Sequence, residues 1–231
     1  TLFHRLLEFA KGNPVLCDVV FSFDRYFTAE GFEANYGYLM KLHEAGIDAI
    51  PVTHDIKNRE YHKFINAGFT KIAIGQDTNR RGISLLQDRV LDMTMSGVSH
   101  IHLFGVGTPE KLLYIPVTSC DASSYIQFAR LGIINYWDDE IKEINKSQQF
   151  IVPIFNGTIQ SSMVEGRSLE EHKKRLFEIL SEAGIDITWD DLLSENSSVF
   201  IEIINMIYYL QVEKACTDMH GNLWKNALIS G

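Results

Sequence analysis

The chain has little cysteine and no long apolar segment. Its three cysteines, Cys17, Cys120 and Cys216, are widely separated in a sequence of 231 residues. This is too sparse for a disulfide framework, so we expect reduced thiols in a cytoplasmic protein. No apolar run approaches the roughly 18 residues of a membrane-spanning helix, and the first five residues do not resemble a secretory signal. We therefore expect no membrane partner.

Positive charge is also scarce. The formal net charge is −9 at pH 7, which argues mildly against nucleic-acid binding because contacts with phosphates need clustered Lys and Arg. Two short basic clusters, Arg80-Arg81 and Lys173-Lys174-Arg175, could form a local basic groove. Each could equally be a solvated surface. The charge therefore does not decide for or against a nucleic-acid partner.

A repeated unit organises the first half of the chain. Helix-like segments end at Gly46, Gly68 and Gly97, and each glycine is followed at once by a short apolar run. Such a glycine can adopt the left-handed conformation that ends a helix. Before Gly97, the residues Ile83, Leu86, Val90 and Met93 fall on one helical face, and before Gly46 the residues Phe32, Tyr36, Leu39 and Met40 do the same. The unit therefore reads as helix, glycine, strand.

The apolar runs are nearly continuous, as in strands of a parallel sheet buried on both faces. The expected strands lie near 15–23, 49–54, 70–75, 99–105 and 115–120, with two more at 133–137 and 150–155. Alternating strands and helices indicate either a barrel or a doubly wound sheet. We expect an α/β protein of the (β/α)8 barrel type, with one or two barrel strands outside this sequence.

The pattern changes after about residue 165. Residues 168–183 predict an amphipathic helix with Ser168 as N-cap and Glu171 completing a capping box. Residues 196–215 predict a second helix. We expect a single domain over residues 1–231, with barrel strands and helices in 1–165 and closing helices in 166–231.

Polar residues follow each expected strand, where the chemistry of such barrels is found. Asp24 and Asp121 each come directly after an apolar run, so both carboxylates are expected at one mouth. Two such carboxylates can divide the roles of nucleophile and ligand anchor. The alternative is that each caps the following helix, which we favour for Asp55 and Asp77.

Two other patterns near the strand ends are weaker. Gly105-Val106-Gly107 turns into a helix with Thr108 as N-cap and Pro109 at its first position, where backbone N–H groups could hold a phosphate. His54, His100 and His102 raise the question of a metal, but no cluster of zinc spacing accompanies them, so we expect neither metal nor cofactor.

Four segments carry a resemblance to a known family. Residues 102–113, HLFGVGTPEKLL, closely resemble the HLMGVGxPEDLL segment of tRNA-guanine transglycosylases. Residues 20–24, VFSFD, are similar to that family's VMxFDE, and residues 69–75, FTKIAIG, to its GFDGYAIGG. Cys120-Asp121 falls where the family has MFDC. The resemblance covers roughly residues 15–125.

The resemblance implies a (β/α)8 barrel and a pentosyltransferase that replaces guanine in a nucleic acid with a 7-deazaguanine. By position, Asp121 resembles the nucleophile that forms a covalent glycosyl–enzyme intermediate, and Asp24 the acid that hydrogen-bonds the base edge. Thr53 or His54 falls at the family's base-contacting Gln, and Gly75-Gln76 at its glycine-rich base-contacting loop. Gly105 and Gly107 are carried over from the most specific segment as substrate-binding residues.

The sequence also departs from the family. It has no first-strand DSGGF, whose Asp assists proton transfer, which fits an amino-terminal part lying outside this sequence. Ser123-Ser124-Tyr125 replaces PTR after the nucleophile, and Cys216 and His220 alone cannot form the family's zinc motif. These departures resemble the DNA-modifying (DpdA type) transglycosylases of phages and genomic islands, which insert a 7-deazaguanine such as preQ0.

We therefore expect a DNA substrate, with partner proteins of a DNA-modification system. A queuine- or archaeosine-type tRNA enzyme and a non-catalytic partner subunit of a transglycosylase stay open. An unrelated barrel lyase has little support. Such an enzyme would need a lysine at the carboxyl end of a strand, whereas Lys71 lies at the amino-terminal end of its expected strand.

Overall fold

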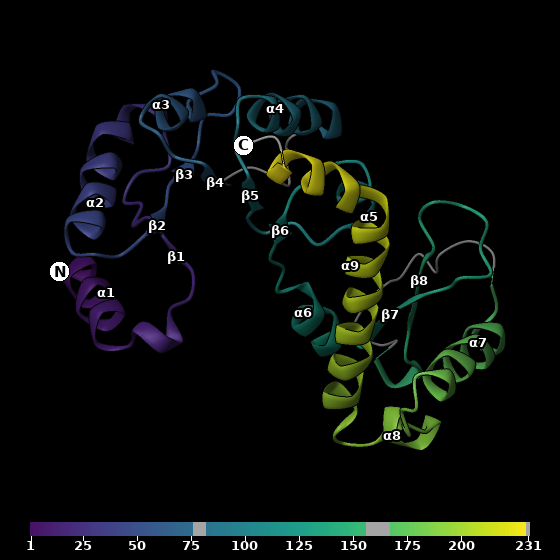
Figure 1. Ribbon diagram of the computed structural model, residues 1–231. Helices are drawn as coiled ribbons and strands as arrows, with labels where there is room; N and C mark the ends of the chain where they lie inside the picture. Colours follow the sequence, from purple (N-terminus) through teal and green to yellow (C-terminus); the bar gives the residue numbers. More distant parts are fainter. Residues whose placement is uncertain (76–81, 156–166, 230–231) are drawn as a thin grey trace. The chain divides into compact units, whose positions relative to one another are not determined.

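The computed structural model describes residues 1–75, 82–155 and 167–229 (Figure 1). Its α-helices are α1 (Leu2–Gly12), α2 (Phe32–Glu44), α3 (Tyr61–Asn66), α4 (Ile83–Met95), α5 (Pro109–Leu112), α6 (Ser124–Arg130), α7 (Leu169–Glu182), α8 (Trp189–Leu193) and α9 (Ser197–Ile229). Its strands are β1 (Val20–Phe21), β2 (Ala49–Ile50), β3 (Val52–Thr53), β4 (Lys71–Ile74), β5 (His100–Leu103), β6 (Ser119–Cys120), β7 (Ile133–Trp137) and β8 (Ser147–Ile151). Short 3-10 helices span Pro14–Leu16, Ala29–Gly31 and Pro153–Phe155.

The strands of the first half pair in parallel and in chain order. β1 pairs with β2, and β3, β4, β5 and β6 follow one another in a second sheet. Only Pro51 separates β2 from β3 along the chain, so the two sheets continue one series of parallel strands. The described residues therefore form a mixed α/β protein with mostly parallel strands, and the predicted strands in 15–120 are confirmed with shorter bounds.

The connections confirm the predicted unit of helix, glycine and strand. Gly46, Gly68 and Gly97 have φ of +80°, +91° and +90°. These values lie in the left-handed region that glycine enters without a steric penalty from Cβ. Each N–H bonds back to the preceding helix; the N–H of Gly97, for example, donates to the carbonyl of Thr94 at 3.1 Å. Each glycine thus ends its helix and turns the chain into the next strand.

The helices cover the sheet through the predicted apolar faces, with one exception. Leu86, Val90 and Met93 of α4 are fully buried. In α2 the predicted Phe32 and Leu39 are buried, but Met40 is exposed and Leu42 is buried in its place. In Figure 1, α2, α3 and α4 follow one another along the outside of the row of strands.

The chain divides into two compact units. The first contains Thr1–Val106, Tyr114–Asp121 and His220–Gly231, and the second contains Gly107–Leu113 and Ala122–Met219. The first unit holds strands β1 to β6, and the second holds β7 and β8. A single domain over 1–231 stays a prediction.

The second unit corrects the expected role of its strands. β7 confirms the strand expected at 133–137, whereas the one expected at 150–155 lies at Ser147–Ile151 as β8. The two pair with each other in antiparallel register, Ile133 opposite Ile151 and Trp137 opposite Ser147. They do not continue the parallel series, because no helix intervenes between them and the chain returns directly as a hairpin.

A buried ion cluster closes this hairpin. Asp138 is fully buried directly after β7; Arg167 lies 2.6 Å from its Oδ2, and the Nε of Arg175 donates to its Oδ1 at 2.9 Å. The pKa of Asp138 is lowered: burial raises it, but hydrogen bonds from Arg175 and Arg167 outweigh that effect. Asp138 is therefore held as a carboxylate between two guanidinium groups.

The two helices predicted after residue 165 are confirmed, one with a different end; that they close a barrel stays a prediction. Ser168 caps α7 and forms the predicted capping box with Glu171. The second predicted helix, expected to end at residue 215, continues as α9 to Ile229. In the part of the chain that the structure describes, we find no helix with the length and apolarity needed to cross a membrane.

Candidate active site

Asp24 lies just after β1, and both of its carboxylate oxygens are bound. The Oγ of Ser22 donates to Oδ1 at 2.9 Å, and the Nε2 of His54 lies 3.0 Å from Oδ2. The side chains of Asp24 and His54 are 9% and 5% exposed. The predicted base anchor is thus a buried carboxylate whose position is fixed by its two partners.

Glu60 organises the segment that carries His54. Its Oε2 accepts from the Thr53 hydroxyl at 3.0 Å and from the backbone N–H groups of His54 at 2.7 Å and Asp55 at 3.3 Å. Thr53 is fully buried, so its hydroxyl serves this loop in the structure described. Asp55 caps the following turn by accepting from the N–H of Asn58, as the sequence favoured.

Gly75 leaves room for the His54 ring. A Cβ at this position would lie 2.7 Å from Cε1 and 2.8 Å from Nδ1 of His54, closer than real contacts allow. Phe27 packs edge-on against the other side of the ring, with centroids 5.3 Å apart. In the structure Gly75 makes room for His54, the partner of Asp24; the base contact that the resemblance assigns to Gly75 stays a prediction.

Asp121 follows β6 and is held through one oxygen only. Its Oδ1 accepts from the N–H of Gly105 at 2.9 Å, and the Nε2 of His102 lies 3.3 Å from the same atom. Gly105 has φ of +68°, a conformation that turns its N–H toward the carboxylate at low cost in a glycine. No residue that the structure describes binds Oδ2, and the Asp121 side chain is 57% exposed.

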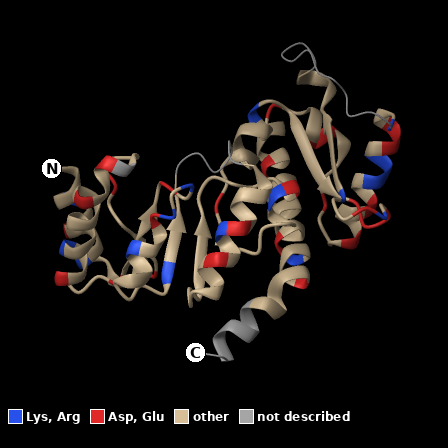
Figure 2. Cartoon of the chain, turned by 90° about the horizontal axis from the view of Figure 1, so that it is seen from above, with Lys and Arg blue, Asp and Glu red and all other residues tan. Residues whose placement is uncertain are grey.

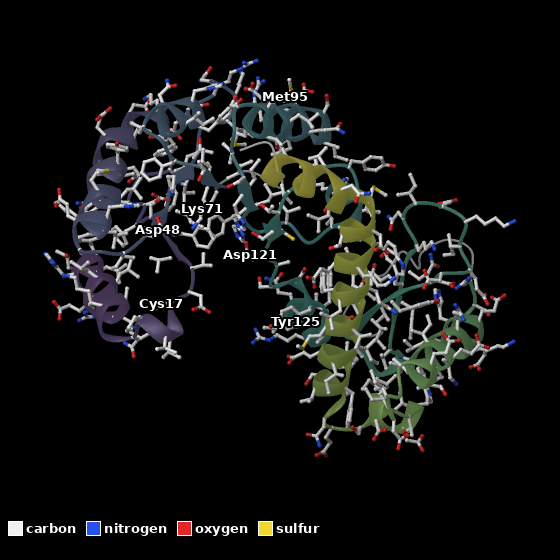
Figure 3. The ribbon with its side chains drawn as sticks, in the orientation of Figure 1. Cys17, Asp48, Lys71, Met95, Asp121 and Tyr125 are labelled. Carbon is white, nitrogen blue, oxygen red and sulfur yellow. The ribbon has the colours of Figure 1, made fainter. Side chains whose placement is uncertain are left out.

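The curvature of the sheet brings both strand ends around His102. The ring of Phe21, on β1, lies 4.7 Å from the rings of both His102 and Phe104 between centroids. In Figure 3, Asp121 lies on the concave side of the row of strands in the first unit. Asp24 and Asp121 thus follow the carboxyl ends of β1 and β6, two strands of the parallel series; that both carboxylates face one mouth stays a prediction.

Two residues that sequence reasoning did not single out complete these networks. Ser119 lies between two imidazoles: its Oγ is 2.9 Å from Nδ1 of His102 and 3.1 Å from Nε2 of His100. Glu60 is the other. Residues 100 and 102 share one face of their strand, and so do residues 119 and 121. Had the pairing register of the two strands been known, the sequence could therefore have suggested that Ser119 lies among these histidines. No local sequence pattern indicates the role of Glu60.

Two predicted site residues are not brought into this group. Gln76 lies outside the described residues. Gly107 belongs to the second unit, where a Cβ would lie 2.5 Å from the Cβ of Ala122. Thr108 and Pro109 do begin a helix, but α5 has only 4 residues. The roles of Gln76 and Gly107 in binding stay predictions.

Burial lowers the pKa values of the two histidines on β5. Burial lowers the pKa of His102, against the opposing effect of Asp121, and burial also lowers the pKa of His100, assisted by His102 and Lys71. Both imidazoles are therefore neutral at pH 7. Within the three described ranges, no group of three or more His, Cys, Asp or Glu side chains could hold a metal ion.

Two of the three cations in the basic cluster of α7, Lys173 and Arg175, have acidic partners nearby. The Nζ of Lys173 lies 3.3 Å from Glu170 and 4.4 Å from the centroid of the Trp189 ring. Arg175 binds Asp138 and Glu178. Figure 2 shows both basic and acidic residues on this helix, so the cluster is best interpreted as a solvated and largely ion-paired surface. The other cluster, Arg80-Arg81, lies outside the described residues.

No family model matches this chain, and neither does any curated protein.

Proposed function

We propose that the chain is a guanine transglycosylase that replaces guanine in a nucleic acid, with DNA favoured, by a 7-deazaguanine such as preQ0. One observation carries the proposal. The Asp121 carboxylate accepts at Oδ1 from the N–H of Gly105, with the Nε2 of His102 3.3 Å from the same atom, while Oδ2 carries no bond from a described residue and the side chain is 57% exposed. A carboxylate so held can present one oxygen to an incoming sugar.

The proposed reaction is a double displacement at the anomeric carbon. Oδ2 of Asp121 forms a bond to C1′ as the bond from C1′ to N9 of guanine breaks, and guanine leaves with the electron pair and takes up a proton from water. The deazaguanine then loses its N9 proton to water and bonds to C1′ through N9, as the bond from C1′ to Oδ2 breaks and releases Asp121 as a carboxylate. A carboxylate suits this chemistry because the transition state resembles an oxocarbenium ion.

Asp24 is proposed to hydrogen-bond the edge of the base. Its carboxylate is kept in place by Ser22 and His54, and each carboxylate oxygen has further lone pairs with which to accept from a base N–H. His54 lies beside it for the same role. The resemblance of residues 20–24 and 69–75 to the family's base-binding segments supports this assignment.

We further propose that β1 to β6 belong to a (β/α)8 barrel. If β2 and β3 are counted as one strand, β1 and β5 are three strand spacings apart, which is about 14 Å in a flat sheet. The rings of Phe21 and His102 are nevertheless in contact. Such curling, with helices outside, favours a barrel over an open doubly wound sheet.

DNA is preferred over tRNA because the sequence departs from tRNA-modifying members in residues 123–125 and lacks their zinc motif. The retained and positioned Asp121 argues against a non-catalytic partner subunit. Partner proteins of a DNA-modification system are proposed on the same resemblance.

The test is exchange of radiolabelled guanine and preQ0 into DNA and into tRNA, side by side. We expect label in DNA, lost in Asp121→Ala and retained in Asp88→Asn, a change at an exposed carboxylate of α4. Label in tRNA alone would move the protein to the tRNA branch. Label in neither, or exchange that survives Asp121→Ala, would overturn the proposal.

A further inference from the structure

A row of polar groups runs along two neighbouring strands to Asp121. The Nε2 of His100 is 3.1 Å from the Oγ of Ser119, which is 2.9 Å from the Nδ1 of His102. The Nε2 of His102 is 3.3 Å from the Oδ1 of Asp121. His102 lies opposite Ser119 in the parallel register of β5 and β6. The spacing of two residues on each strand puts all four side chains on one face.

The chemistry of the partners fixes the direction of this row. A carboxylate only accepts hydrogen bonds, so His102 presents its proton on Nε2 toward Asp121. A neutral His102 then has a bare Nδ1, which accepts from the hydroxyl of Ser119. The oxygen of Ser119 is left to accept from Nε2–H of His100. Every donor therefore points toward Asp121.

At the Asp121 end of the row, the hydrogen-bonding capacity of His102 Nε2 is not fully used. The His102 side chain is 9% exposed, yet its Nε2 does not complete a well-aligned hydrogen bond with any described residue, although Asp121 is near. An N–H buried in this way is costly unless it is paired. It is placed to tighten on Asp121 when a ligand excludes water from the site.

The other end of the row opens on a pocket. His100 and Lys71 line a cavity of about 300 Å³ at the amino-terminal ends of the strands of the first unit. Asp48, which also lines it, lies 3.0 Å from the Nζ of Lys71, and both are labelled in Figure 3. His100 can therefore exchange protons with solvent through this pocket, at the end of the strands opposite to Asp121.

From this arrangement we infer that His102 is a positioning residue for Asp121, and that Ser119 and His100 fix the tautomer in which it can act. The inference rests on the proposed role of Asp121 as nucleophile. His102 holds Oδ1, which aims Oδ2 at the sugar. Ser119 supplies the hydrogen that keeps Nδ1 of His102 an acceptor, and so keeps the proton on Nε2.

The groups that face His102 set how the row responds to pH. Burial lowers the pKa of His102, and Asp121 at the end of β6 opposes this effect. At the far end of the row, burial, His102 and Lys71 on β4 all lower the pKa of His100. Protonation of His102 would convert Nδ1 into a donor and reverse the bond to Ser119. The bond to Asp121 would then no longer depend on Ser119.

The first experiment measures the row directly, without catalysis. Nitrogen-15 NMR of the full chain should show His102 as the neutral Nε2–H tautomer at pH 7. In Ser119→Ala the tautomers should become mixed, while His43→Gln, which changes a half-buried histidine bonded to the carbonyl of Ala49, should leave the His102 signals unchanged. An Nδ1–H tautomer in the unaltered chain, or no change in Ser119→Ala, would overturn the inference.

The second experiment asks whether the row serves Asp121. In single-turnover exchange, Ser119→Ala should slow formation of the covalent adduct about tenfold at pH 7 with KM unchanged, the effect of one lost hydrogen bond. The loss should shrink below the pKa of His102, where the imidazolium holds its Nε2 proton regardless. A loss equal at every pH would mean a merely structural role. If NMR confirms the Nε2–H tautomer but no exchange is found, the proposed function is wrong, whereas the hydrogen-bonded row from His100 to Asp121 is still supported.

Discussion

The ring of Phe21 on β1 lies against the ring of His102 on β5, with centroids 4.7 Å apart. Two strands lie between them in the parallel series: the one that β2 and β3 form together, and β4. The parallel series must therefore curl, and the concave face gathers aromatic rings around an imidazole that also contacts Asp121. This relationship connects the architecture of the first unit with the candidate nucleophile.

Asp24→Asn should weaken binding of the base more than it weakens the fold. An amide keeps the shape of the carboxylate but loses its charge and offers only one acceptor oxygen to Ser22, His54 and the base. We expect about 10- to 100-fold weaker binding of preQ0, the range for a hydrogen bond to a charged group. Equilibrium dialysis with labelled preQ0 measures it. Unchanged affinity, with Asp88→Asn as control, would count against the anchor role.

Gly75→Ala should disturb the site through His54. The added methyl would lie 2.7 Å from Cε1 of His54, so the ring must leave its place beside Asp24. We expect a loss of about 1–3 kcal/mol in the free energy of unfolding, typical of overpacking, together with weaker preQ0 binding. Urea unfolding and dialysis measure the two effects.

Gly37→Ala is the matched control for that substitution. Gly37 lies inside α2, and a Cβ there would meet nothing within 4 Å. Because alanine favours helices over glycine by up to about 1 kcal/mol, this variant should be slightly more stable and bind normally. Equal effects of the two substitutions would contradict the proposed seating of His54.

Some of this architecture is readable in the sequence because it depends on neighbouring residues. The helix ends at Gly46 and Gly97 and the capping box of Ser168 with Glu171 are local signals, and all are confirmed. Strand pairing is not a local property: the short segments of β7 and β8 would suit either a parallel or an antiparallel sheet. The order 100–119–102–121 depends likewise on the register of two strands, which no single segment specifies.

Asp138→Asn should destabilise the second unit strongly at neutral pH. Its carboxylate is fully buried between Arg167 and Arg175. Removing its charge leaves the two guanidinium groups without the negative charge that compensates them. We expect a loss of about 3 kcal/mol, as for other broken buried ion pairs. Asp139→Asn, next along the chain but 75% exposed in its pair with Lys146, should cost little. Urea titrations of both variants make the comparison.

The same carboxylate should make stability depend on pH. Because the pKa of Asp138 is lower in the folded protein than in the unfolded chain, its ionised form stabilises the fold above the unfolded value near 4. That contribution is lost as the pH falls through the folded-state pKa. The difference in unfolding free energy between the unaltered chain and Asp138→Asn should therefore narrow in acid. A constant difference from pH 7 to pH 3 would contradict the charged state assigned to Asp138.

Glu60→Gln should loosen the loop that presents His54. The Oε2 of Glu60 accepts from the hydroxyl of Thr53 and from two backbone N–H groups, those of His54 and Asp55. A glutamine oxygen can accept from the same donors, but without the charge that makes such bonds about twice as strong. We expect a loss of about 1–2 kcal/mol in unfolding free energy, measured by urea titration, with Glu44→Gln at the exposed end of α2 as control. Faster amide hydrogen exchange at His54 should accompany it, because its N–H loses a charged acceptor. If exchange at His54 is unchanged while stability falls, Glu60 stabilises the fold without holding this loop.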